Sequence, residues 1–190
     1  MKYPLIFFVL VLFILLLQCG QTIPERHYYI IDYIADNSDS YNLPCSTFSF
    51  PLPLKVRINP FSIPRIYDRR NITVRYSPYE LNYYRYHLWA LRPDENITDL
   101  VLRHFQKAKL FDVLSQDFYQ SIPDLEIKGD IISIEQYYHK GENVSNFSAH
   151  LNMKLELYEK DRPLPIVVHM VDREEELYHE NMKYFVLALS

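Results

Sequence analysis

The residues best suited to metal chemistry are seven histidines, which are widely scattered along the chain: His27, His87, His104, His139, His150, His169 and His179. A catalytic zinc site usually takes two histidines from one helical turn, as in the pattern HExxH, and the sequence contains no such pair. We therefore expect solvated or strand-edge histidines and no resident metal or other cofactor.

Motifs for covalent catalysis and phosphate binding are missing as well. The sequence contains no GxSxG nucleophile elbow, and Cys45 has no motif partner. With three glycines in 190 residues, it has neither a GxGxxG pattern nor a Walker-type loop. These observations predict a protein that is not an enzyme and that works through a binding surface.

Arginine and tyrosine side chains gather between residues 65 and 92. Both residue types are enriched at interfaces, and guanidinium groups suit anionic partners. We predict that Tyr67, Arg69 and Arg75 bind a partner from loop and strand-edge positions that contribute little to the core. The alternative is that these arginines pair with nearby acids, such as Asp68 and Glu80.

The N-terminus has the pattern of a signal peptide. An apolar run over residues 5–17 is shorter than the roughly 20 residues of a transmembrane helix and fits a signal-peptide core. The run ends in Leu16-Leu17-Gln18-Cys19, which resembles the bacterial lipobox, with Gln18 in place of the usual small residue. The resemblance implies cleavage after residue 18 and attachment of lipid (diacylglycerol, palmitate) to Cys19. The alternative is an ordinary signal peptide with an unrelated cysteine.

The state of Cys45 depends on that modification. Lipidation of Cys19 leaves Cys45 as a lone thiol, whereas an unmodified Cys19 could form a disulfide with it.

Gly20 follows the lipobox cysteine, and by the enteric sorting rule this favours the periplasmic side of the outer membrane over the inner membrane. A eukaryotic glycoprotein is a further alternative, because four N-x-S/T sequons begin at Asn71, Asn96, Asn143 and Asn146.

Charge and length limit what the mature part can be. The whole chain has a formal net charge of −4, and removal of the signal peptide with Lys2 makes it about −5, which argues against a nucleic-acid-binding surface. We divide the chain into a signal peptide (1–18), a lipidated tether (19–26) and a single domain (27–190), which is long enough for a substantial core.

Hydrophobic patterning predicts strands at 27–34, 52–58, 72–76, 80–86, 111–114, 123–136, 147–158 and 164–171. Pro93, Asp94 and Glu95 mark the start of an amphipathic helix, and residues 174–190 have a second helical pattern. The acidic run 172–176 then belongs to the first turn of that last helix. We expect Trp89, between strand and helix, to be buried. The predicted fold class is α+β, a mixed, mostly antiparallel sheet with two helices packed on one face.

Several segments follow one another in a characteristic order: the lipobox cysteine followed by RHYYIIDY, then Tyr67 and Arg69 upstream of a strand, then Trp89-Ala90 before a helix, and LVLRHFQKAKLFDVL. In this order they resemble the ABC-type transport auxiliary lipoproteins, the family of paraquat-inducible protein C. The resemblance covers most of residues 20–190.

This resemblance implies a non-catalytic auxiliary component of a lipid transport system across the bacterial envelope. The implied partners are an MCE (mammalian cell entry) domain protein with its ABC permease and ATPase, the membrane through the lipid anchor, and further copies of the chain in a homo-oligomeric ring. An outer-membrane assembly lipoprotein, acting as a chaperone or plug of a membrane complex, is the alternative function.

Overall fold

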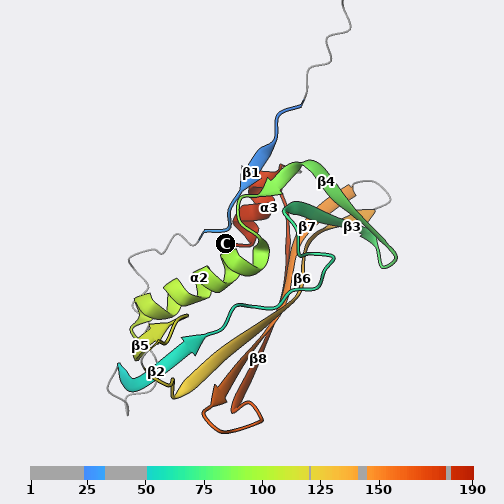
Figure 1. Cartoon of the computed structure of the whole chain (residues 1–190). Helices are drawn as coiled ribbons and strands as arrows, with labels where there is room; N and C mark the ends of the chain where they lie inside the picture. The colour runs from blue at the N-terminus through green and yellow to red at the C-terminus, as the bar shows by residue number, and fades with distance from the viewer. Residues whose placement is uncertain (1–23, 33–50, 120, 141–144, 179–180) are drawn as a thin grey trace, which may run out of the picture.

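The computed structural model describes residues 24–32, 51–119, 121–140, 145–178 and 181–190, which form one eight-stranded sheet and two helices (Figure 1). The strands are β1 (His27–Tyr29), β2 (Leu52–Ile58), β3 (Asn71–Ser77), β4 (Glu80–Trp89), β5 (Phe111–Ser115), β6 (Leu125–Lys140), β7 (Ser145–Glu159) and β8 (Val167–Glu176). The helices are α2 (Pro93–Ala108) and α3 (Met182–Ala188).

The long strand β6 organises the sheet. Along one edge it pairs with β7 over its whole length, and along the other it pairs first with β2 and then with β3. A register shift between Ile131 and Ser133 changes which side chains face the core. Beyond this shift the strand is buried on both faces, from Ser133 to Gln136. The break in the alternation of β6 therefore lies at Ile132.

The sheet is mixed, as expected, but the prediction of a mostly antiparallel sheet is wrong. Four of its seven strand pairings are parallel: β1 with β4, β2 with β5, β2 with β6 and β3 with β6. The antiparallel pairings are β3 with β4, β6 with β7 and β7 with β8. Parallel neighbours come from segments distant in sequence, and hydrophobic patterning carries no information about such pairings.

Helix α2 begins where the sequence indicates. Pro93 lies in its first turn beside Asp94 and Glu95, and Lys109 closes it in the left-handed conformation, with φ of 49°. The helix contacts β5 and β6, whereas α3 contacts β7. The prediction that both helices pack on one face of the sheet is not confirmed.

The second helix is much shorter than predicted. Residues 174–176 continue strand β8, so the acidic run 172–176 lies on an edge strand and not in a first helical turn. Helix α3 starts only at Met182, where the Asn181 side chain accepts a hydrogen bond from the Lys183 backbone N–H. The pairing of β8 with β7 outweighs the helical pattern of this charged segment.

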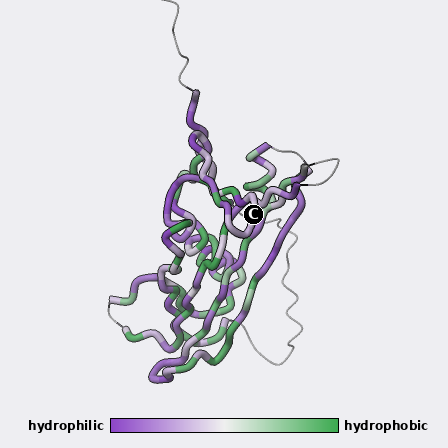
Figure 2. The backbone as a smooth tube through the Cα atoms, turned by 90° about the vertical axis from the view of Figure 1, so that its right-hand side faces the viewer, coloured by the Kyte–Doolittle hydropathy of each residue, from purple (hydrophilic) through white to green (hydrophobic). Residues whose placement is uncertain are grey.

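One hydrophobic core joins the sheet and both helices. Trp89 is 2% exposed, as predicted, and its ring centroid lies 5.9 Å from that of Phe185 on α3. Phe61 lies across β6, where Gly129 leaves room for its ring. Figure 2 shows hydrophobic and hydrophilic stretches alternating along the strands, the pattern of a sheet with one face in the core and one in solvent.

Candidate partner-binding site

Tyr67 lies in the connection between β2 and β3, which folds back onto the sheet. The backbone N–H groups of Tyr67 and Asp68 both donate to the Pro64 carbonyl, at 2.9 and 3.0 Å, and that of Arg69 donates to the Tyr67 carbonyl. This tight turn directs the Tyr67 side chain inward, where it is 3% exposed. The loop that begins at Asn59 and ends at Arg70, here called the Tyr67 loop, is thus fastened by its own tyrosine.

The Tyr67 hydroxyl meets a buried ion pair. It donates to Glu135 Oε2 at 2.7 Å, while Arg75 Nε donates to Glu135 Oε1 at 2.7 Å. Arg75 Nη2 also donates to the Tyr67 hydroxyl at 2.9 Å, which closes a triangle of three side chains. Glu135, on β6, is 1% exposed, so the buried negative charge of its carboxylate has to be compensated by these two partners.

Electrostatics fix the protonation states in this triangle. Burial raises the pKa of Tyr67 above its ordinary value, and the Glu135 carboxylate raises it further. The hydrogen bond to Glu135 likewise raises the pKa of Arg75. The triangle therefore holds a neutral tyrosine and a permanently charged arginine, which makes it a rigid support rather than a proton-transfer site.

Arg69 lies outside this triangle and is exposed. Its guanidinium carbon lies 4.0 Å from the centroid of the Tyr83 ring on β4, a cation–π contact that orients the side chain. Four exposed arginines form no ion pair with a carboxylate within the part of the chain that the structure describes. They are Arg65, Arg69, Arg70 and Arg85. We call these four the arginine surface; it can accept an anionic or aromatic partner.

Arg92 behaves differently, because acids surround it. It pairs with Asp68 at 2.9 Å, with Asp94 at 3.0 Å and with Glu95 at 3.2 Å. These pairs join the Tyr67 loop to the start of α2. Pairing with nearby acids is therefore confirmed for Arg92 and Asp68, whereas Arg75 takes a partner from a distant strand.

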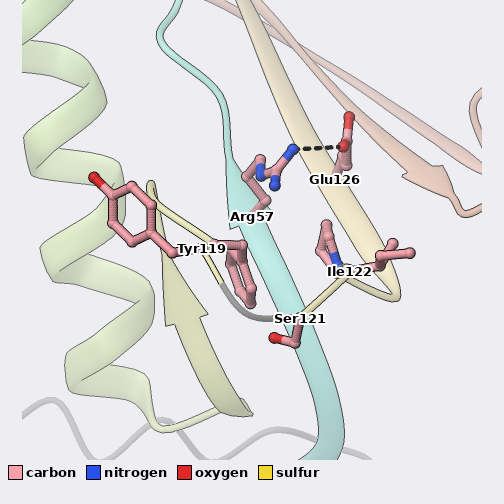
Figure 3. A pocket seen from close by; sticks show the side chains of 7 residues that line it. Arg57, Tyr119, Ser121, Ile122 and Glu126 are labelled. Carbon is pink, nitrogen blue, oxygen red and sulfur yellow. Dashed lines mark hydrogen bonds and ion pairs between the residues drawn. The ribbon is translucent and has the colours of Figure 1, made fainter.

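A polar hollow of about 490 Å³ lies beside the last residues of β2 and the first residues of β6 (Figure 3). Its lining residues are Arg57, Phe118, Tyr119, Ser121, Ile122, Pro123 and Glu126. Its charged residues satisfy each other, since Arg57 pairs with Glu126 at 3.3 Å. Among the lining residues that the structure describes, no nucleophile is hydrogen-bonded to a base.

Sequence comparison with protein families gives a match over residues 46–186 to the ABC-type transport auxiliary lipoprotein component. The chain belongs to this family. Its members are auxiliary components of ABC-type transport, and their description as lipoproteins supports a position in the cell envelope. The matched residues include the Tyr67 loop and its support on β6, whereas Cys19 precedes them.

Two solved structures share the fold of this auxiliary component. Protein XCC0632 from Xanthomonas campestris superposes with a TM-score of 0.69 at 16% identity, over 85% of each chain. An uncharacterized protein superposes with a TM-score of 0.62 at 10% identity, over 87% of this chain and 90% of that chain. No curated protein matches the chain.

The three predicted site residues of the auxiliary component do not share one role. The structure brings Tyr67 and Arg75 together and leaves Arg69 on the surface nearby. The expectation that all three contribute little to the core is wrong for Tyr67. Sequence reasoning missed Glu135, although a carboxylate within the apolar run IISIE is a signal for a buried, paired acid.

Two histidines of the auxiliary component are paired with acids of β8. His139 Nε2 lies 2.8 Å from Glu174, and His150 Nε2 lies 2.8 Å from Asp172. The Ser148 hydroxyl, more than His139, lowers the pKa of Glu174. Within the described residues, no three His, Cys, Asp or Glu side chains are grouped as a metal site.

The N-terminal segment of the auxiliary component is fixed to α2 by a sequon residue. The Asn96 amide accepts from the Ile31 N–H at 2.9 Å and donates to the Ile31 carbonyl at 3.0 Å. Both the oxygen and the nitrogen of the Asn96 side-chain amide form these hydrogen bonds, and the residue is buried, so a glycan on Asn96 is incompatible with the fold. Cys19 and Cys45 lie outside the described residues, and among those described no helix has the length and apolarity to cross a membrane.

Proposed function

We propose that this protein is a membrane-anchored, non-catalytic auxiliary component of an MCE/ABC-type lipid transport system in the bacterial envelope. The observation that carries the proposal is family membership over residues 46–186. The expected partners are an MCE-domain protein with its ABC permease and ATPase. The anchor is lipid on Cys19, on the periplasmic side of the outer membrane, with the inner membrane as the alternative.

The proposed docking site is the arginine surface, which includes Arg69. Tyr67 and Arg75 contribute to docking indirectly, because their hydrogen bonds to Glu135 hold in place the loop that carries Arg69. The stack of Arg69 on Tyr83 restricts the guanidinium before a partner arrives, which reduces the entropy lost on binding.

The docking test is co-purification of the transporter with the full-length protein from bacterial membranes. We expect Arg69→Ala to weaken capture about tenfold, equivalent to about 1.4 kcal/mol, without changing the melting temperature. Arg162→Ala is the matched control, since Arg162 is exposed and, among the described residues, pairs with its neighbour Glu159 alone. Full capture by a variant with Arg65, Arg69 and Arg70 all changed to Ala would contradict this docking site.

The anchor has a separate test. Cys19→Ala should move the protein from the detergent phase to the aqueous phase when membranes are partitioned, because the lipid is lost. Retention of the variant in the detergent phase would refute lipidation of Cys19. Capture of an outer-membrane assembly complex in place of a transporter would favour the alternative function.

A further inference from the structure

Strand β8 is an edge strand whose first half lacks the usual protection of an edge. Within the described residues β8 pairs with β7 alone. Its first half, 167–171 (VVHMV), contains no acid, lysine, arginine or proline. Val168 is 52% exposed and Met170 is 54% exposed. Natural edge strands are usually blocked by charge or proline, so this half of β8 is open to pairing with a further strand.

The register shows which backbone groups of β8 are available for such pairing. Leu177 N–H donates to the Phe147 carbonyl at 2.8 Å, one position beyond the last pair of the β7–β8 ladder. Because bonding alternates along an antiparallel ladder, odd-numbered residues of β8 bond to β7. The N–H and C=O groups of Val168 and Met170 therefore point away from the sheet, and loss of either N–H leaves the ladder with β7 intact.

An apolar hollow of about 270 Å³ lies beside this edge on the core side of the sheet. Val167 and His169 of β8 line it, together with Phe105 of α2 and Phe111 of β5. Recognition by strand addition combines backbone hydrogen bonds along an edge with hollows that receive alternate side chains. The first half of β8 has both features, whereas a hydrocarbon chain would fill the hollow and leave the backbone groups unused.

The second half of β8, 172–176 (DREEE), selects the charge of an added strand, because it has four acids and one arginine. Asp172 and Glu174 are paired with histidines of β7 and β6, at 2.8 Å in each case. Glu175 and Glu176 are exposed, and neither forms an ion pair within the part of the chain that the structure describes. Carboxylates at one end of the edge attract lysine or arginine and repel an acidic strand.

We infer that β8 binds an extended segment of a partner protein, which adds to the sheet as an antiparallel strand. The segment has apolar residues opposite 167–171 and lysine or arginine opposite Glu175 and Glu176. One of its apolar side chains enters the hollow from the position opposite His169. Strands β6 and β7 lie between β8 and the β3–β4 pair, so this site is separate from the arginine surface and from the docking proposed there.

Binding of a synthetic peptide to the full-length protein in detergent tests this site, with fluorescence anisotropy of the labelled peptide as the measurement. The probe is KKTTTVVVTV. In the antiparallel register its lysines lie opposite Glu175 and Glu176, and its three consecutive valines lie opposite 169–171. The control probe is EETTTVVVTV, which differs only in the sign of these two charges. We expect saturable binding of the first peptide and about tenfold weaker binding of the second.

Two variants change the outward edge of β8 and leave its bonds to β7 in place. Val168→Pro removes an outward N–H, and proline is tolerated on an edge strand when its nitrogen faces solvent. Val168→Thr is the matched control, because it keeps the N–H and nearly the same shape. We expect Val168→Pro to weaken binding of KKTTTVVVTV about tenfold or more, and Val168→Thr to leave it within about twofold. Met170→Pro repeats the test at the second outward N–H if Val168→Pro does not fold.

Equal affinities of the folded proline and threonine variants, equal binding of the two peptides, or no saturable binding by the natural chain would each overturn the inference. Displacement of the peptide by palmitate, with no difference between the two Val168 variants, would assign the hollow to a hydrocarbon chain instead. Peptide binding only after dissociation of an oligomer that Val168→Pro also dissociates would assign the edge to a second copy. Capture of the transporter does not enter these measurements, so this inference and the proposed docking site can fail separately.

Discussion

The Tyr67 hydroxyl donates a 2.7 Å hydrogen bond to the Glu135 carboxylate, across 68 positions of the sequence. This bond joins the Tyr67 loop to the central strand β6, where the Glu135 carboxylate is almost inaccessible to solvent. Arg75 supplies the neutralising charge on the other carboxylate oxygen. The position of the exposed Arg69, two residues along the loop, therefore depends on a bond made in the core.

Removing that hydroxyl should destabilise the fold. Tyr67→Phe leaves Glu135 buried with one bond fewer, which should lower the free energy of unfolding by about 1–3 kcal/mol in chemical denaturation. Arg162→Ala, which breaks the exposed pair with Glu159, should cost less than about 1 kcal/mol. Equal stabilities for the two variants would show that the Tyr67–Glu135 bond does not hold the loop.

Trp89 should be among the most sensitive positions in the core. It is the sole tryptophan and packs against Phe185, so Trp89→Ala should lower the free energy of unfolding by about 3–5 kcal/mol. Tyr119→Ala, at a position that is 90% exposed, should change it by no more than about 0.5 kcal/mol. Tryptophan emission at a wavelength typical of solvent exposure in the natural protein would contradict the burial of Trp89.

Gly129 should not tolerate a side chain. A Cβ there would lie 2.5 Å from Phe61 Cγ, and the buried ring would have to move. Gly129→Ala should therefore lower the free energy of unfolding by about 1–3 kcal/mol. The same change in a Phe61→Leu background should cost less, because the ring is gone. A double-mutant cycle with no coupling between the two positions would rule out this contact as the cause.

Local features of the sequence predicted the local structure well. Pro93 with Asp94 and Glu95 located the start of α2, and strict alternation located β7 to within two residues at its start and one at its end. Trp89 was predicted to be buried from its position between a strand and a helix. Each of these signals depends only on neighbours in the chain.

The rest depends on contacts between distant segments. Both β2 and β3 pair with the same edge of β6, and the hydrophobic pattern of a single strand does not reveal which strand it pairs with. Glu135 and Arg75 are 60 positions apart, so their pairing could not be inferred from spacing. The segment after Asp172 has a helical pattern, yet it pairs with β7 as far as Glu176, because the ladder bonds outweigh local propensity.

The attachment of β1 should weaken in mild acid through His87. Tyr29 Oη lies 3.0 Å from His87 Nδ1, and His27 stacks on the same ring with centroids 5.6 Å apart. Burial lowers the pKa of His87, and the neighbouring His27 lowers it further. The folded state therefore favours neutral His87, while the unfolded chain takes up a proton near the ordinary histidine pKa of about 6.5.

The sign of the pH dependence follows from this difference in proton binding. The stability that neutral His87 contributes is complete above about pH 6.5, and it is lost as the pH falls through the lowered pKa of the folded protein. We expect the melting temperature of the natural protein to fall more steeply between about pH 7.5 and 5 than that of His87→Gln, whose amide still accepts a bond from Tyr29 but cannot titrate. His169→Gln, at the exposed edge of β8, controls for the loss of a histidine elsewhere and should keep the natural slope. Parallel curves for the natural protein and His87→Gln would show that protonation of His87 does not affect folding. A steeper fall in the natural protein would trace this acid sensitivity to His87 at the junction of β1 and β4, the point where the N-terminal segment joins the sheet.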